Sequence, residues 1–133
     1  MAIEGGGRPL TAEQLEEWVK PDATTRERIQ LLLGVGVYAP ELAETCDVSV
    51  SALRSWGNGS SRPRREAAVM LDRLRVIASL LIDSGMEPER IGHWLRAYDP
   101  DLNTTPLERL RESSMDVINT AAALARKREL AGV

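Results

Sequence analysis

The strongest constraint on the fold is a helix-start signal that occurs three times along the chain. A threonine is followed three residues later by Gln or Glu, at Thr11–Gln14, Thr24–Glu27 and Thr105–Glu108, and apolar residues follow at helical spacing. In such a capping box each side chain binds a backbone N–H group of the other residue and fixes the first turn of a helix. The sequence therefore predicts helices that begin at these three points.

The stretches between these signals also have helical periodicity, and we find no convincing strand signal. Pro40 suits the first turn of a helix, and a second short helix is expected over residues 50–56. From 64 to 84, apolar residues keep helical spacing for about six turns before Gly85. Further helices are expected over 87–98 and 115–129. We predict an all-α fold.

The composition agrees with packed helices. The chain has no Phe and only 4% aromatic residues, so Leu, Ile, Val, Ala and Met must fill the core. With 133 residues, of which 43% are hydrophobic, one compact domain or two small lobes are expected. Cys46 stands alone, which excludes an internal disulfide, and no apolar run could span a bilayer. A cytoplasmic protein is expected.

Charge is spread unevenly along the chain. The formal net charge is −3 overall, but residues 24–75 contain eight arginines against six acidic residues, whereas residues 1–23 and 76–133 are both acidic. A basic middle between acidic flanks indicates one surface for an anionic partner and other surfaces for other contacts.

The segment 40–56 has the pattern of two short helices joined by a tight turn. Ala43 is small enough for a crossing helix, Asp47 tolerates the left-handed backbone of a turn, and Ser49 can cap the second helix. Leu53 and Trp56 then face the core. The outer face of the second helix would carry Val50, Ser51, Arg54 and Ser55.

These residues resemble the helix-turn-helix of the Xre and phage-repressor class, with Asp47 standing where that class usually has glycine. The matching positions are Leu42, Ala43, Val48, Ser49, Trp56, Gly59 and Pro63. The resemblance implies DNA binding, in which residues 50–55 would read bases and Arg62, Arg64 and Arg65 would touch phosphates. The implied DNA-binding residues are Ser49, Val50, Ser51, Arg54, Ser55, Arg62, Arg64 and Arg65. The alternative is that these arginines are a solvated helix start paired with nearby acids.

The tail resembles the toxin-binding domain of the Xre/MbcA/ParS antitoxins. The matching positions are Trp94, Leu95, Pro100, Leu102, Pro106, Leu107, Leu110 and Val117. The resemblance implies a chain that covers the active-site cleft of a RES-domain toxin, which destroys NAD, and that binds its own promoter. The implied toxin-binding residues are Trp94, Leu95, Leu102, Asn103, Thr104, Pro106, Leu107, Arg111, Ala121 and Arg126. For the alanines, the alternative is packing within this chain.

The residue types needed for catalysis are sparse. His93 is the only histidine, no phosphate-binding glycine motif occurs, and adjacent carboxylates such as Glu16 and Glu17 point apart on a helix. We predict no enzyme activity, no metal site and no cofactor.

The sequence thus predicts an N-terminal extension over 1–23, an Xre-like helix-turn-helix bundle over 24–85 and a small helical toxin-binding domain over 86–133. The leading hypothesis is a type II antitoxin that inhibits a RES-domain toxin and represses its operon, as a homodimer within a larger complex. One alternative is a stand-alone Xre-family regulator whose C-terminal helices only dimerise. Another is an interaction protein that has lost DNA binding.

Overall fold

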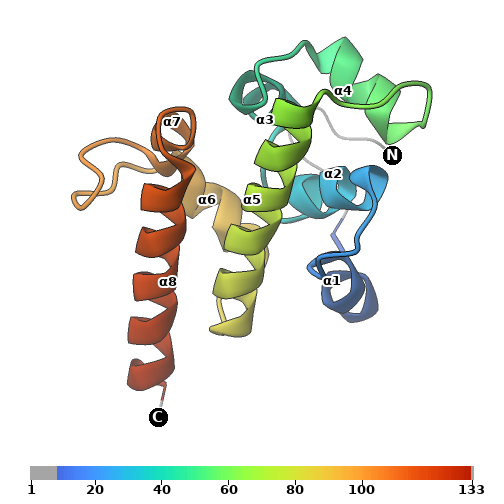
Figure 1. Cartoon of the computed structure of the whole chain (residues 1–133). Coiled ribbons are helices and arrows are strands. Elements are labelled where there is room, and N and C mark those ends of the chain that lie inside the picture. The colour runs from blue at the N-terminus through green and yellow to red at the C-terminus, as the bar shows by residue number, and fades with distance from the viewer. Residues whose placement is uncertain (1–8, 133) are drawn as a thin grey trace.

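The computed structural model describes residues 9–132, and this part of the chain is helical throughout apart from its turns and one isolated bridge between Asp99 and Thr104. Figure 1 shows the long α5 at the centre, with α1 and α2 on one side, α6 and α8 on the other, and α3 and α4 near its N-terminal end. The all-α prediction is confirmed. The eight helices of the described residues are α1 (Ala12–Trp18), α2 (Thr25–Gly34), α3 (Ala39–Thr45), α4 (Val50–Gly57), α5 (Arg65–Asp83), α6 (Glu89–Arg96), α7 (Pro106–Leu110) and α8 (Ser114–Ala131).

Two of the three predicted capping boxes form completely, at the starts of α1 and α2. At the start of α7 the box is half formed. The Thr105 hydroxyl accepts from the backbone N–H of Glu108, but the Glu108 carboxylate accepts from the hydroxyls of Thr104 and Thr105. A neighbouring threonine therefore competes for the carboxylate that was expected to cap the backbone.

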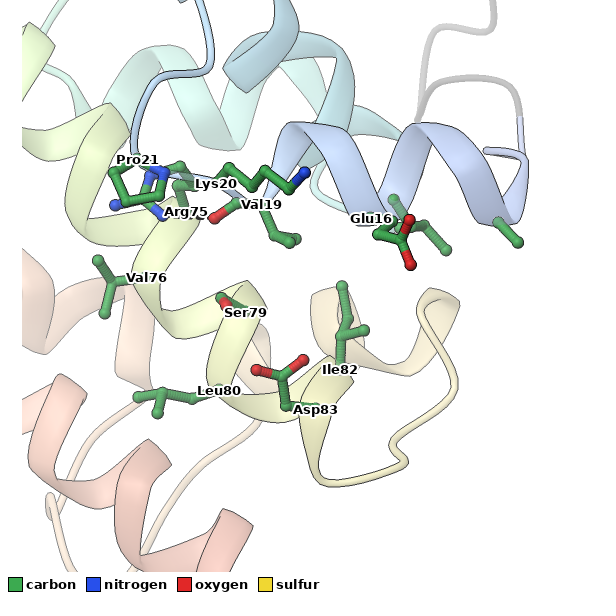
Figure 2. Close-up of a pocket in the computed structure, with 12 residues that line it drawn as sticks. Glu16, Val19, Lys20, Pro21, Arg75, Val76, Ser79, Leu80, Ile82 and Asp83 are labelled. Atoms are coloured by element: carbon green, nitrogen blue, oxygen red, sulfur yellow. Dashed lines mark hydrogen bonds between the residues drawn. The ribbon is translucent and has the colours of Figure 1, made fainter.

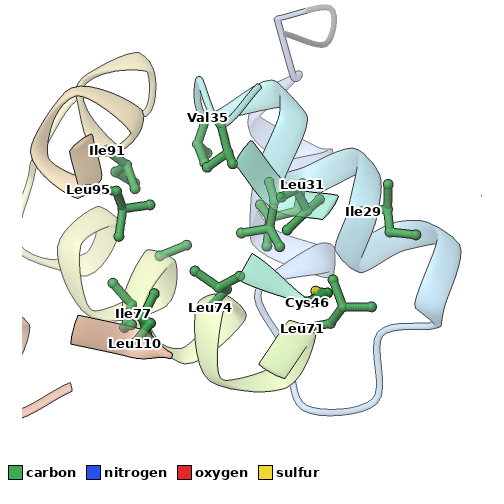
Figure 3. Close-up of a cluster of buried hydrophobic side chains, with 14 of the residues drawn as sticks. Ile29, Leu31, Val35, Cys46, Leu71, Leu74, Ile77, Ile91, Leu95 and Leu110 are labelled. Carbon is green, nitrogen blue, oxygen red and sulfur yellow. The ribbon is translucent and has the colours of Figure 1, made fainter. Parts of the chain in front are cut away.

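One hydrophobic core runs through the molecule (Figure 3). Leu71, Leu74 and Ile77 of α5 lie at its centre, with Leu31 of α2 on one side and Leu95 of α6 on the other. The longest helix, α5, packs against α2 and α8. The core therefore continues past the turn at Gly85, where the sequence suggested a division between two segments.

The α1–α2 connection is fastened to α5 by a buried arginine. The side chain of Arg75 donates to the backbone carbonyl of Val19 and, over 2.8 Å, to Asp72. Arg28 of α2 donates to the carbonyl of Pro21 over 2.9 Å and lies 3.1 Å from the same Asp72 carboxylate. Buried arginines need such partners, so this network fixes the N-terminal helix against the core.

Within residues 9–132 no helix is long and apolar enough to cross a membrane.

Candidate functional site

The unit formed by α3, its turn and α4 has the local geometry that the sequence predicts. Asp47 has φ of +59°, the N–H of Val48 donates to the carbonyl of Ala43 over 2.9 Å, and Ser49 caps α4 by accepting from Ala52 N–H. Aspartate tolerates this left-handed conformation better than most residues. Val48 is partly buried beside the core.

The side chains of α4 divide into an inner and an outer face. Leu53 and Trp56 are 3% and 7% exposed and belong to the core, as predicted. Ser51 and Arg54 are exposed on the opposite face, and Val50 is partly exposed. The outer face is therefore accessible along a helix of two turns, the length that a DNA major groove accommodates.

Four arginines surround this outer face without acidic partners. Arg54, Arg62, Arg64 and Arg65 are all exposed, and none forms a salt bridge to another residue of the described chain. Within residues 9–132 these arginines therefore do not pair with neighbouring acids, as the alternative interpretation of the sequence had them do. Unpaired guanidinium groups retain their donors for phosphate or carboxylate oxygens of a partner.

Arg62 and Arg64 also line a hollow beside the first turn of α4. Its other lining residues include Asp47, Ser49 and Trp56. The hollow thus joins the loop before α5 to the start of α4, where Ser49, another predicted DNA-contact residue, caps the helix.

The predicted toxin-binding residues divide by burial. Leu95, Leu102, Pro106 and Ala121 are buried because the tail packs on α5 and on itself, and their apolar side chains form part of that packing. That they contact a partner stays a prediction. Accessible surface remains on Trp94, Asn103, Thr104, Leu107, Arg111 and Arg126, and their role stays a prediction.

These accessible residues lie in different places. Asn103 has φ of +59° in the turn before α7, and its side-chain oxygen accepts from the Tyr98 hydroxyl over 2.7 Å. Arg111 lies 3.8 Å from Glu44 of α3, close to the start of α4. Arg126 is near the C-terminal end of α8, the end that lies far from α7 in Figure 1. Among these neighbours, sequence reasoning missed Tyr98, which is 62% exposed. The helix predicted over 87–98 would place it on the same stripe as Leu95, whereas α6 ends at Arg96.

A polar junction joins the tail to α3. The Arg96 guanidinium donates to both carboxylate oxygens of Glu41 over 2.9 Å and to the carbonyl of Gly36, and it stacks 4.3 Å from the centre of the Tyr38 ring. Burial raises the pKa of Glu41, but the hydrogen bonds from Arg96 and from the Tyr38 backbone outweigh it, so that the pKa is lowered overall. The same carboxylate raises the pKa of Arg96.

Beside this junction two glycines let the chain segments approach closely. The N–H of Gly92 in α6 donates to the carbonyl of Val35 over 2.9 Å, and a Cβ atom on Gly92 would lie 2.2 Å from the Gly36 oxygen. The tail is therefore placed on the first part of the chain by a contact that no larger residue fits.

A pocket of about 780 Å³ lies between α1 and α5 (Figure 2). Leu15, Val19, Val76, Leu80 and Ile82 make most of its wall aliphatic. Its position, away from α4, gives it no part in the arginine-rich surface.

The groups available for metal binding or thiol chemistry are few. Residues 9–132 contain no group of three or more His, Cys, Asp or Glu side chains that could hold a metal ion. Cys46 is buried, and burial raises the pKa of its thiol to about 12, so the thiolate is negligible at neutral pH.

The fold and the site together define a small all-α protein in which an exposed, arginine-rich two-helix unit and a helical tail share one core. No protein-family model and no solved structure matches the chain. A protein of Mycobacterium tuberculosis described as a probable mycobacterial cidal antitoxin is 32% identical over 97 residues, which cover 72% of this chain and 82% of that protein. The chain belongs to the same family as this antitoxin.

Proposed function

We propose that this chain is the antitoxin of a type II toxin–antitoxin system, which inhibits a RES-domain, NAD-degrading toxin through its tail and represses its own operon through α3 and α4. The similarity to the mycobacterial antitoxin carries this proposal. A match of 97 residues is too long to lie within residues 1–85 alone or within residues 86–133 alone. It therefore extends into both the α3–α4 unit and the tail.

The unpaired arginines support the DNA-binding part. If Arg62, Arg64 and Arg65 each contact one phosphate and two copies bind together, the log–log dependence of affinity on salt should have a slope of about −5. Gel-shift titrations with the chain's own promoter fragment measure this slope. Arg64→Ala and Arg65→Ala should weaken binding to every duplex and flatten the slope, whereas Arg54→Ala should lower the preference for the promoter.

A matched control is Arg90→Ala, which removes an exposed arginine of α6 on the other side of α5. It should leave the salt slope unchanged. Equal binding by the wild type and all four variants would remove the DNA-binding role.

The toxin-binding part rests on the tail's resemblance to toxin-binding domains and on its accessible residues. Co-expression with a RES-domain protein encoded next to this chain should restore growth and cellular NAD, and the two proteins should copurify. Arg126→Glu should weaken the complex by reversing an exposed charge of α8, while Arg26→Glu, an exposed arginine of α2, should not. Failure of both rescue and copurification rejects this role.

The second candidate is a stand-alone regulator whose C-terminal helices only dimerise. Met115 of α8 and Val69 of α5, which are 57% and 37% exposed, favour it because they line the same surface hollow, and neighbouring exposed apolar side chains can mark a protein contact. A dimer by light scattering that is lost in Met115→Glu, combined with no toxin binding, would select this candidate over the antitoxin.

A further inference from the structure

The loop between α4 and α5 carries the side chains on which phosphate contact would depend. It runs over residues 58–64 and contains Arg62 and Arg64, while Arg65 begins α5. These guanidinium groups are exposed and lack acidic partners among residues 9–132, so no ion pair restrains them, and the backbone conformation of the loop sets the points from which these side chains extend.

Hydrogen bonds fold this loop back onto α4. The hydroxyls of Ser55 and Ser61 share a hydrogen bond of 2.7 Å, and the Ser55 carbonyl accepts from the N–H groups of Ser60 (2.9 Å) and Ser61 (3.4 Å). The side chain of Asn58 accepts from Ser60 N–H over 2.9 Å, and Gly59 has φ of +82°, a conformation that glycine adopts without strain. Ser55 is thus the point on α4 where the loop is tied down.

The Ser55 hydroxyl therefore has a partner inside the chain. The sequence placed Ser55 among the residues that would read bases, beside Ser51 and Arg54. Both of those side chains are exposed and form no side-chain hydrogen bond within the described residues, whereas the Ser55 hydroxyl is hydrogen-bonded to that of Ser61. We propose that the Ser55–Ser61 hydroxyl pair is a latch that positions Arg62 and Arg64 for phosphate contact, and that Ser55 reads no base. The inference rests on the proposed DNA binding.

The latch makes specific predictions about affinity. A loop that is ordered before binding loses less conformational freedom when the complex forms, and one hydrogen bond between neutral groups limits this advantage to about twofold to tenfold in affinity per bound protomer. Without the latch the same arginines still reach the same phosphates in the complex. The salt slope and the sequence preference should therefore stay unchanged while the affinity falls.

The test is a double-mutant cycle of Ser55→Ala, Ser61→Ala and the double variant in the full-length chain. Each is titrated across a salt series with the chain's own promoter fragment and with a scrambled duplex of the same length and base composition. The two single variants and the double variant should lose the same twofold to tenfold per protomer on both duplexes, at unchanged salt slope and with a loss of folding stability no larger than that of one hydrogen bond. Ser61→Thr, which keeps the hydroxyl, should restore binding, and Ser79→Ala on α5 is the matched serine control.

The outcomes separate the latch from its premise. If the wild type binds neither duplex, the DNA-binding proposal is refuted, and the latch is refuted with it. If the wild type binds, the latch alone is overturned by any of three results. These are a Ser61→Ala variant with wild-type affinity, losses that add in the double variant, or a Ser55→Ala variant that changes the preference for the promoter over the scrambled duplex.

Discussion

Replacing Gly92 by alanine tests how the tail is placed on the rest of the molecule. Gly92 lies in α6 where this helix crosses the α2–α3 connection, and its N–H donates to the Val35 carbonyl. A Cβ atom there would lie 2.2 Å from the oxygen, 2.4 Å from the carbonyl carbon and 2.9 Å from the Cα of Gly36. All three atoms are backbone atoms, so no side chain can turn aside to make room.

The size of the effect follows from these distances. A carbon atom and a carbonyl oxygen normally approach to about 3.3 Å, so the two segments must separate by about 1 Å. Overpacking of a close contact costs about 1–3 kcal/mol, and loss of the Gly92–Val35 hydrogen bond adds about 1–2 kcal/mol. Gly92→Ala should thus lower the free energy of unfolding by about 2–5 kcal/mol, a large part of the roughly 5–15 kcal/mol available to a typical domain.

Thermal and urea unfolding followed by circular dichroism measure this loss, and the melting temperature should fall by roughly 10–20 °C. The matched control is Gly57→Ala at the end of α4, where a Cβ atom would meet nothing within 4 Å. It should leave stability unchanged or raise it by about 0.5–1 kcal/mol, because alanine restricts the unfolded chain. Equal stabilities of the two variants would refute the close approach of α6 to Gly36.

Three further predictions concern the core and the junction. Glu41→Gln should lower the free energy of unfolding at neutral pH by about 1–2 kcal/mol, because Arg96 loses a charged acceptor. The folded-state pKa of Glu41 is lowered, so the difference in unfolding free energy between the wild type and this variant should be complete above the unfolded pKa of about 4.3 and disappear as the pH falls through the folded pKa. Urea titrations at a series of pH values measure this difference, and a pH-independent difference contradicts the prediction. Cys46, 8% exposed with its pKa raised to about 12, should resist iodoacetamide in the folded protein and react in urea; modification at equal rates in both would show that the thiol is accessible. Trp56→Ala should lower the free energy of unfolding by about 3–5 kcal/mol in the same urea assay, and a loss below about 1 kcal/mol would show that Trp56 is not a core residue.

The helices and their caps were predictable because their signals are local. The threonines before α1 and α2 bind backbone groups only three residues away, and Asp47 adopts a left-handed conformation that its own side chain tolerates. The division of α4 into a buried and an exposed face was also predictable, since Leu53 and Trp56 are three residues apart on a helix.

The identity of the tail's accessible residues was not predictable in the same way. A resemblance placed Leu95 and Ala121 at a partner, and only the packing of the tail on itself and on α5 shows that they are 1% and 0% exposed. The hydroxyl partner of Ser55 was likewise not predictable, since it lies across a loop.

The sequence by itself determined where helices begin and end, which side of α4 faces the core, and the concentration of arginines around residues 54–65. Only the tertiary structure decided that α6 meets the α2–α3 connection at Gly92 and Gly36, and that Arg96 pairs with Glu41, 55 residues away. The physical reason is the separation along the chain between the residues that interact. A cap or a helical stripe depends on neighbours within about four residues, whereas burial and ion pairing depend on which distant segments share the same core.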